Sequence, residues 1–331
     1  MKAFEYAVPT RPHEMLALLA DYPEETAILA GGTDLVPLMA KMIVTPRRVV
    51  NITGVAGLGG ISADSQGVTI GATTTLDELL ESNLLADFPA VLEAIRGINS
   101  DALQCSGTIG GELLQRPQCW YFRAGDGLLA DNGRNVAVGD NRYHAIFGNG
   151  GPAKFVSPSR IAPALIALSA QARLIGPGPE DEAYVPVEAL YRSPRDARQS
   201  EFVLEPGQVL AQIHIPAADG VTNATYEIRQ GAGPDFPLVS AAAAVSLVGG
   251  VVREVKVVLG QVAPTPWNAY AAEEAMIGQA VTLETATAAG DAVAAQATPL
   301  SHNEYKVQLA SVAVRRALLA AAGLPTGGFD S

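Results

Sequence analysis

The pattern of apolar and polar positions divides the chain into short strand-like and helix-like segments, separated by glycine, proline and polar residues. Short runs rich in β-branched residues and bounded by glycine or polar residues predict strands. Apolar residues at helical spacing, several of them just after a proline, predict helices. The predicted strands are residues 26–29, 49–52, 67–71, 171–175, 209–215, 224–229, 241–248 and 251–259. One predicted helix begins at Pro12 and another begins near Leu76. The other predicted helices cover residues 89–98, 161–169, 266–277, 283–295 and 304–322.

The order of these segments predicts an α+β protein of three units. Residues 1–55 combine strand, helix and strand in a length that suits a small parallel βαβ element. Residues 56–220 hold strands and helices on either side of a long polar stretch over residues 115–156. Residues 221–331 predict a three-stranded antiparallel sheet with helices on one face, its last two strands joined by a Gly249-Gly250 turn.

Composition and charge exclude several classes of protein. Hydrophobic residues make up 48% of the 331 residues and charged residues 17%, which is typical of a folded globular chain. The net charge of -12 argues against a nucleic-acid partner, which selects a basic face. The N-terminus lacks the apolar core of a signal peptide, and no apolar run is long enough to span a bilayer. Cys105 and Cys119 are the only cysteines, so we expect no disulfide framework and a reducing compartment, the cytoplasm.

The first candidate for chemistry is the segment 29–35, Leu-Ala-Gly-Gly-Thr-Asp-Leu, which we name the first glycine loop. A strand that ends in Gly31-Gly32 brings backbone N–H groups close to an anion, because no Cβ blocks the approach. A helix that begins at about Asp34 adds further free N–H groups. The alternative is a plain strand–turn–helix connection. The Rossmann fingerprint and the P-loop are both excluded here, since this segment has neither G-x-G-x-x-G nor a following Gly-Lys-Ser/Thr.

A second segment, residues 106–112, reads Ser-Gly-Thr-Ile-Gly-Gly-Glu, and we name it the second glycine loop. It offers more backbone free of Cβ, together with the hydroxyl of Thr108, so the two loops could grip one dinucleotide from both sides. Residues 73–75 are three threonines that end a predicted strand and offer further hydroxyls. Their alternative role is to cap the following helix, with Thr75 and Glu78 as a capping box.

Residues 115–156 are polar, rich in glycine and aromatic, and a loop of this length inside a compact domain is usually functional. We expect Phe122 and Phe147 to pack a small core within this stretch, whereas Trp120 suits a subunit interface. His144 has no second histidine at metal-ligand spacing, and no Ser/His/Asp set with a recognisable elbow is present. The sequence therefore predicts neither a metal ligand nor a catalytic side chain.

The two glycine loops together resemble the FAD-binding medium subunit of molybdenum hydroxylases, the xanthine dehydrogenase and carbon monoxide dehydrogenase flavoprotein family. The matching motifs are Ala-Gly-Gly-Thr-Asp-Leu at 30–35 and Thr-Ile-Gly-Gly at 108–111. Further segments similar to that family follow in order at residues 69–75, 157–159, 260–266 and 305–318. The resemblance implies a two-subdomain FAD-binding domain of the PCMH type, followed by a C-terminal α+β flavoprotein domain.

The resemblance also implies a function. In that family, electrons pass from a molybdenum cofactor on a large subunit, through 2Fe-2S centres on a small subunit, to FAD on the medium subunit and then to an external acceptor. FAD on this chain and those two partner subunits are therefore expected. The alternatives are a free-standing flavin-dependent oxidoreductase that acts directly on a small substrate, and a scaffold that has lost FAD. The implied cofactor-binding residues are Leu29, Ala30, Gly31, Gly32, Thr33, Asp34, Leu35, Thr74, Thr108, Ile109, Gly110, Gly111, Glu112, Arg160, Asp235 and Leu238.

The stretch 115–156 resembles an insertion in the branch of 4-hydroxybenzoyl-CoA reductase and the bacterial aldehyde oxidoreductases, and we name it the insertion. In that branch the insertion carries the cysteines of a 4Fe-4S cluster. Only Cys119 matches such a position here, and the others are filled by residues such as Tyr143 and Pro152 or Ala153. Because a cluster ordinarily needs four thiolates, we expect no 4Fe-4S cluster in this chain. Some relatives in this branch reach the periplasm with an exported partner, which is the alternative to a cytoplasmic location.

Two residues depart from the family pattern. Glu112 stands where the family usually has asparagine, and a carboxylate beside a pyrophosphate is repulsive unless it is paired or turned away. Arg160 replaces the acid of a Pro-Ser-Asp motif, and we hypothesise that Arg160 compensates Glu112 if the two meet. Asp235 precedes a buried run that the family uses near the isoalloxazine ring, and its alternative role is a solvated cap at the entry of a strand.

Overall fold

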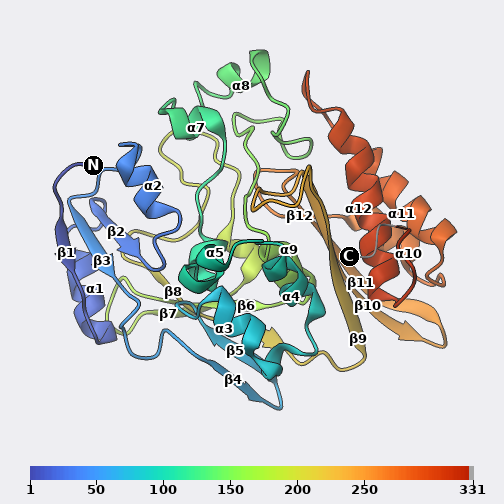
Figure 1. Ribbon diagram of the computed structural model, residues 1–331, viewed down its shortest axis with the longest axis horizontal. Coiled ribbons are helices and arrows are strands. Elements are labelled where there is room, and N and C mark those ends of the chain that lie inside the picture. The colour runs from blue at the N-terminus through green and yellow to red at the C-terminus, as the bar shows by residue number, and fades with distance from the viewer. Residues whose placement is uncertain (328–331) are drawn as a thin grey trace.

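The computed structural model describes residues 1–327 and contains three β-sheets with helices packed on them (Figure 1). The N-terminal sheet lies at the left of Figure 1, the largest sheet in the middle and the C-terminal sheet at the right. This mixture of helices and sheets confirms the predicted α+β class. Within the described residues, no helix has the length and apolar character needed to cross a membrane.

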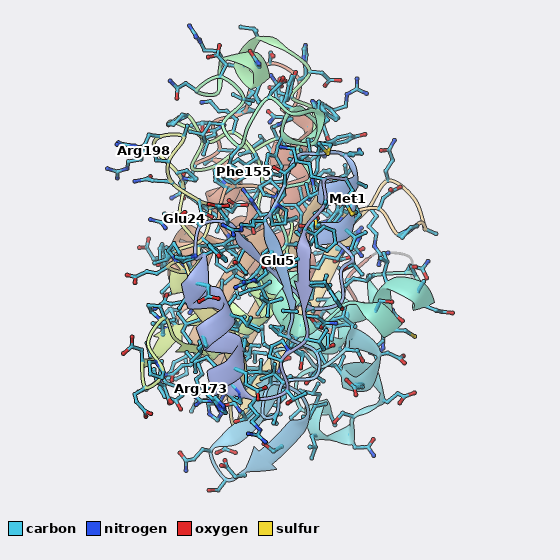
Figure 2. All side chains as sticks on the ribbon, turned by 90° about the vertical axis from the view of Figure 1, so that its left-hand side faces the viewer. Met1, Glu5, Glu24, Phe155, Arg173 and Arg198 are labelled. Carbon is cyan, nitrogen blue, oxygen red and sulfur yellow. The ribbon has the colours of Figure 1, made fainter. Side chains whose placement is uncertain are left out.

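The N-terminal sheet is parallel, with the strand order β1-β3-β2. Its unit consists of β1 (Glu5–Ala7), α1 (Pro12–Asp21), β2 (Thr26–Leu29), α2 (Leu35–Ala40) and β3 (Arg48–Asn51). Pro12 starts α1, and Met15 and Leu19 bury the apolar face that the sequence pattern predicts. Figure 2 looks onto this unit, with Glu5 on the edge strand β1. The parallel βαβ prediction is confirmed, but β1 escapes prediction because its three residues are largely exposed.

The middle sheet is antiparallel and has five strands in the order β4-β5-β8-β6-β7. These strands are β4 (Ile61–Asp64), β5 (Gly67–Gly71), β6 (Gln171–Ile175), β7 (Glu182–Pro186) and β8 (Val209–Pro216). The helices of this unit are α3 (Leu76–Glu81), η1 (Asn83–Leu85), α4 (Pro89–Arg96), α5 (Asp101–Ser106), α6 (Ile109–Leu113), α9 (Ala162–Ala167) and η2 (Val187–Leu190). Thr75 Oγ1 accepts from Glu78 N, and the Glu78 carboxylate accepts from Thr75 N at 2.8 Å, which confirms the capping box.

The C-terminal sheet is antiparallel, with the order β12-β11-β10-β9. Its unit consists of β9 (Val221–Ile228), β10 (Val239–Val248), β11 (Val251–Gly260), β12 (Trp267–Asn268), α10 (Tyr270–Met276), α11 (Leu283–Ala294) and α12 (Tyr305–Ala321). The Gly249-Gly250 turn joins β10 to β11 with positive φ at both glycines, as predicted. The predicted helix 266–277 is wrong at its start, because residues 267–268 pair with the edge of β11 as a fourth, very short strand.

Strand β10 is buried on both faces. Ala241 and Ala243 lie in the core formed with the C-terminal helices, whereas Ala242 and Ala244 lie in the core of the middle unit, with residues of α4 and α9. A strand buried on both sides reads as a continuous apolar run rather than an alternating one. The C-terminal sheet is therefore an inner layer, and its contact with α4 places the connection between β9 and β10 beside the middle unit.

The insertion contains two short helices in the part that the structure describes, α7 (Trp120–Ala124) and α8 (Arg134–Val138), at the top of Figure 1. The expectation that Phe147 packs a core within the insertion is wrong. Its ring stacks on Trp267 at a centroid distance of 5.4 Å and belongs to the C-terminal core. Asn141 of the insertion donates a hydrogen bond from Nδ2 to Ser301 Oγ at 3.0 Å, so the insertion packs against the C-terminal unit.

Candidate cofactor-binding site

The first glycine loop leaves β2 after Leu29 and enters α2 at Leu35. Gly32 has a φ of 73°, a conformation that glycine adopts without strain. Among the described residues, the backbone N–H groups of residues 32–35 have no hydrogen-bond partner. Successive unpaired N–H groups in a turn form a concave site that binds anions. The loop therefore carries the donors that a phosphate or pyrophosphate needs.

The two glycine loops touch each other at Gly31. A Cβ at Gly31 would lie 1.8 Å from the carbonyl oxygen of Ser106 and 3.2 Å from Gly107 Cα. No larger residue fits there without moving one of the two backbones. The first glycine of the pair therefore serves the packing of loop on loop, whereas Gly32 serves the turn.

The second glycine loop differs from the expectation that both loops offer free N–H groups. The N–H groups of Ile109 and Gly110 donate to backbone carbonyl groups at 3.0 and 2.9 Å. That of Gly111 donates to Thr108 Oγ1 at 3.1 Å, so Thr108 caps α6. These donors are used within the protein. The second loop supports the first and offers the hydroxyl and the N–H of Thr108, while the row of successive unpaired N–H groups among the described residues comes from the first loop.

Three neighbouring cavities form one extended cleft. The loop cavity, of about 310 Å³, is bordered by both glycine loops. The middle cavity, of about 230 Å³, shares Thr33, Asp34 and Thr108 with it. The aromatic cavity, of about 320 Å³, shares Gln118 and Phe236 with the middle cavity and reaches the C-terminal unit. The shape suits a long ligand whose anionic part lies at the first glycine loop.

Most of the sequence-predicted site residues lie along this cleft. The loop cavity is lined by Ala30, Gly31, Gly32, Thr33, Asp34, Leu35, Thr108, Gly110 and Gly111, the middle cavity by Glu112 and Arg160, and the aromatic cavity by Asp235 and Leu238. Leu29, Thr74 and Ile109 do not line it. The Thr74 hydroxyl accepts from Gly60 N at 2.9 Å and donates to Gly60 O at 3.1 Å, so it fixes the loop before β4 rather than facing the cleft.

Glu112 is buried against the start of α9. Its carboxylate accepts hydrogen bonds from Ser159 Oγ at 2.6 Å and from Arg160 N at 2.5 Å. Burial raises the pKa of Glu112 to about 7, although these hydrogen bonds oppose the shift. The protein itself satisfies this carboxylate, and a raised pKa reduces its negative charge, so it is no obstacle to a nearby pyrophosphate.

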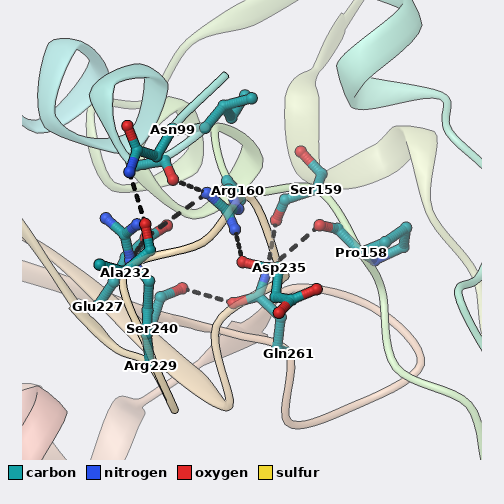
Figure 3. A network of polar contacts seen from close by, with 12 residues as sticks. Asn99, Pro158, Ser159, Arg160, Glu227, Arg229, Ala232, Asp235, Ser240 and Gln261 are labelled. Carbon is teal, nitrogen blue, oxygen red and sulfur yellow. Dashed lines mark hydrogen bonds and ion pairs between the residues drawn. The ribbon is translucent and has the colours of Figure 1, made fainter. Parts of the chain in front are cut away.

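The Arg160 side chain forms no hydrogen bond or ion pair with Glu112, because only the backbone N–H of Arg160 reaches that carboxylate. The charge of Arg160 acts on Glu112 from a distance and lowers its pKa slightly, against the larger effect of burial. The guanidinium points elsewhere and donates to Gly97 O and Asp235 O (Figure 3). Its nearest carboxylate is that of Glu227, at 3.9 Å. Burial lowers the pKa of Arg160, and the charge of Glu227 opposes this shift. Sequence spacing alone does not show in which direction such a long side chain points.

Two arginines of the insertion, which the sequence reasoning missed, bind the first glycine loop. Asp34 Oδ1 accepts from the Arg123 guanidinium at 2.7 Å, and Asp34 Oδ2 accepts from Arg116 N at 2.8 Å. The side chains of Arg123 and Asp34 are 13% and 18% exposed. Both oxygens of Asp34 are thus engaged by the insertion, and only its N–H is left for an anion. The sole signal in the sequence is that a carboxylate in an anion-binding loop needs a partner.

Cys119 and His144 form a neutral pair beside the aromatic cavity, with Cys119 Sγ 3.1 Å from His144 Nε2. Burial lowers the pKa of His144 to about 4 and raises the pKa of the Cys119 thiol. The thiol is therefore not activated as a nucleophile. Among the described residues, no group of three or more His, Cys, Asp or Glu residues is arranged to hold a metal ion. Lys306 donates to the carbonyl oxygens of His144 at 3.2 Å and Gln261 at 2.6 Å, which ties the insertion to α12.

Comparison with known proteins finds matches over nearly the whole chain. The family described as FAD binding domain in molybdopterin dehydrogenase matches residues 2–218, and the CO dehydrogenase flavoprotein C-terminal domain matches residues 224–321. The aldehyde oxidoreductase FAD-binding subunit of Escherichia coli is 30% identical over 94% of this chain and 95% of that protein. The carbon monoxide dehydrogenase medium chain of Hydrogenophaga pseudoflava is 26% identical over 96% of both chains. A solved structure of carbon monoxide dehydrogenase from that organism, lacking the Mo-pyranopterin moiety of the molybdenum cofactor, superposes with a TM-score of 0.77 and 27% identity over 97% of this chain and 98% of the other.

Proposed function

Because the chain belongs to the family of FAD-binding domains of molybdopterin dehydrogenases, we propose that it is the FAD-binding electron-transfer subunit of a heteromeric molybdenum hydroxylase. In this role it passes electrons between iron–sulfur centres of a partner subunit and an external acceptor. FAD supplies the one- and two-electron chemistry when it is bound. The residues of the chain bind the cofactor, orient it and exclude water, and none of them acts as a catalytic acid or base.

The observation that carries this proposal is the row of unpaired N–H groups at residues 32–35, at the end of an extended cleft. A pyrophosphate is a double anion, and successive N–H groups that the protein leaves unpaired at a half-buried turn can all donate to it. Gly31 lets the second glycine loop close against the first, and Thr108 adds a hydroxyl to the same cavity. The residues present therefore fit the pyrophosphate of FAD.

The sixteen residues implied by the family divide into four roles in this proposal. Residues 30–35, Thr108, Gly110 and Gly111 surround the pyrophosphate region, since they line the loop cavity. Glu112 and Arg160 shape the middle cavity, and Asp235 and Leu238 border the far end of the cleft, where the rest of FAD extends. Leu29, Thr74 and Ile109 support these loops from behind.

The partners in this proposal are a large subunit with the molybdenum cofactor and a small subunit with 2Fe-2S clusters. The support is that the relatives bear the names of medium chains or FAD-binding subunits, at nearly full coverage of both chains. We place the subdomain boundaries at residues 55 and 220, on either side of the middle sheet. We also place the protein in the cytoplasm, because a chain with two unpaired cysteines suits a reducing compartment.

Affinity purification of the tagged chain from its native cells tests the partner assignment. We expect two further subunits to purify with it, together with molybdenum, iron in the ratio of 2Fe-2S clusters, and FAD. A chain that carries FAD but purifies alone and oxidises a small substrate by itself would contradict the electron-transfer role.

A further inference from the structure

The connection between β9 and β10, residues 229–238, borders the cofactor cleft, and we name it the strap. Pro234 and Phe236 line the middle cavity, and Phe236 and Pro237 line the aromatic cavity, so the strap lies where these cavities meet. Most of its residues are exposed, and it contains two glycines. A short exposed segment of this kind opens easily unless specific contacts hold it.

Arg160 holds the strap from the side of the middle unit. Its guanidinium donates to Asp235 O in the strap and to Gly97 O just after α4, as Figure 3 shows. The side chain is 2% exposed, and the guanidinium lies 5.6 Å from the centre of the Phe236 ring. One buried side chain thus joins three features, namely the end of α4, the strap backbone and the aromatic ring at the junction of two cavities.

The charge of Arg160 faces a buried carboxylate of the protein that it shares with Arg229. The Glu227 carboxylate, 6% exposed, lies 3.9 Å from the Arg160 guanidinium and 3.0 Å from Arg229 Nε. Because its donors face two backbone carbonyl groups and its charge faces Glu227, Arg160 is engaged in holding protein to protein. A planar guanidinium can donate to two separate acceptors at once, which a lysine ammonium of shorter reach does not reproduce.

Two weaker contacts support the same geometry, and neither comes from the C-terminal unit. Asn99 Nδ2 donates to Ala232 O at 2.5 Å, and Tyr143 Oη donates to Gln230 Oε1 at 3.2 Å. The strap is therefore bound at its start and middle by the insertion and the α4–α5 connection. Of the three side chains that hold it, Arg160 is the fully buried one.

We propose that Arg160 is a positioning residue that holds the strap closed over the cofactor cleft and sets Phe236 on the wall of that cleft where the middle and aromatic cavities meet. The proposal rests on the proposed function in so far as the ligand of the cleft is FAD. With the strap closed, bound FAD is shielded from solvent and leaves slowly. FAD exchange requires the strap to open.

Hydrogen exchange of the full chain without FAD tests the tie itself. Arg160→Lys keeps the charge but cannot reach both carbonyl groups. We expect the N–H of Leu238, which donates to Ile228 O at 2.8 Å across the base of the strap, to exchange about tenfold faster. The matched control is Arg192→Lys, since Arg192 also donates to a backbone carbonyl, Phe202 O at 2.6 Å, and does not line the cleft. Unchanged exchange of the strap in Arg160→Lys would overturn the tie, whether or not the chain binds FAD.

FAD release and iodide quenching test the closure. Phe236→Ala changes a side chain that is 38% exposed, so it should leave the fold intact even if Arg160→Lys does not. We expect Phe236→Ala and Arg160→Lys to release FAD at least about fivefold faster than wild type, with stronger quenching of the bound flavin by iodide, and Arg192→Lys to match wild type. Equal release and quenching in all variants would overturn the closure. A wild-type chain that binds no FAD would overturn the proposed function and the closure together, while the exchange result still decides the tie.

Discussion

The contact of the two glycine loops at Gly31 leads to a sharp prediction. In Gly31→Ala the new Cβ would lie 1.8 Å from Ser106 O, whereas Cβ contacts in proteins stay above 3.0 Å, so the loops must separate by at least 1.2 Å. The obstructing atom belongs to the backbone and cannot rotate away. A shift of this size takes N–H···O distances near 2.9 Å out of hydrogen-bond range. The loss of one or two charge-assisted hydrogen bonds, about 1.5–3 kcal/mol, lowers FAD affinity by about 10- to 100-fold.

Equilibrium titration with FAD, followed by flavin fluorescence, measures this loss. Gly54→Ala is the matched control, because a Cβ at Gly54 meets no atom within 4 Å and its φ is not positive. Thermal unfolding checks that Gly31→Ala is folded, since overpacking itself costs about 1–3 kcal/mol. An affinity of folded Gly31→Ala within about twofold of wild type would refute the loop-on-loop geometry, because the predicted loss is at least tenfold.

Three further predictions concern the charges around the cleft. Glu112 has a pKa of about 7 in the folded protein, against 4.5 for the free side chain, so the folded state holds its proton more tightly than the unfolded state. The stabilisation from this proton is fully present below pH 4.5, and the free energy of unfolding falls by about 3 kcal/mol as the pH rises to 7. Urea unfolding should show this fall in wild type and not in Glu112→Gln, and parallel curves would contradict it. Lys306 has a folded pKa of about 7 against 10.5, so stability rises as pH increases from 7 to 10, and Lys306→Met should lack that rise under the same assay. Arg123→Ala should lower the free energy of unfolding by roughly 1–3 kcal/mol, and a double-mutant cycle with Asp34→Asn that gives no coupling would show that the pair does not bind the insertion.

Much of the fold follows from sequence, because burial on one or both faces leaves a readable apolar pattern. The predicted bounds of β2, β5 and β6 equal the observed ones. The missed strands lack that pattern. In β7, Glu182 and Pro186 are exposed and the residues between them are at most half-buried, so the segment resembles a polar loop. The start of the predicted helix 266–277 fails for a different reason, since backbone pairing with an open sheet edge outweighs a local helix signal.

The motifs locate the cleft, but the partners of its charged side chains depend on contacts between distant segments. Glu112 binds Ser159, 47 positions away, and Asp34 binds Arg123, 89 positions away, and neither pair follows from spacing. The motif around Thr74 predicts that this residue binds the cofactor, but its hydroxyl binds the backbone of Gly60. A sequence motif alone does not distinguish such a local structural role from ligand binding. The sequence predicts repulsion between the Glu112 carboxylate and a pyrophosphate. It does not predict that burial and a backbone N–H donor weaken this repulsion.

The most direct measurement is a visible spectrum of the purified chain after incubation with FAD and removal of free cofactor, with iron analysis on the same sample. We predict flavin absorption from an equimolar amount of FAD, and no iron, because this chain offers too few thiolates for a cluster. A chain that retains no flavin would contradict FAD binding by the two glycine loops. Iron with a broad charge-transfer shoulder would contradict the expected lack of a cluster and point to ligands other than cysteine.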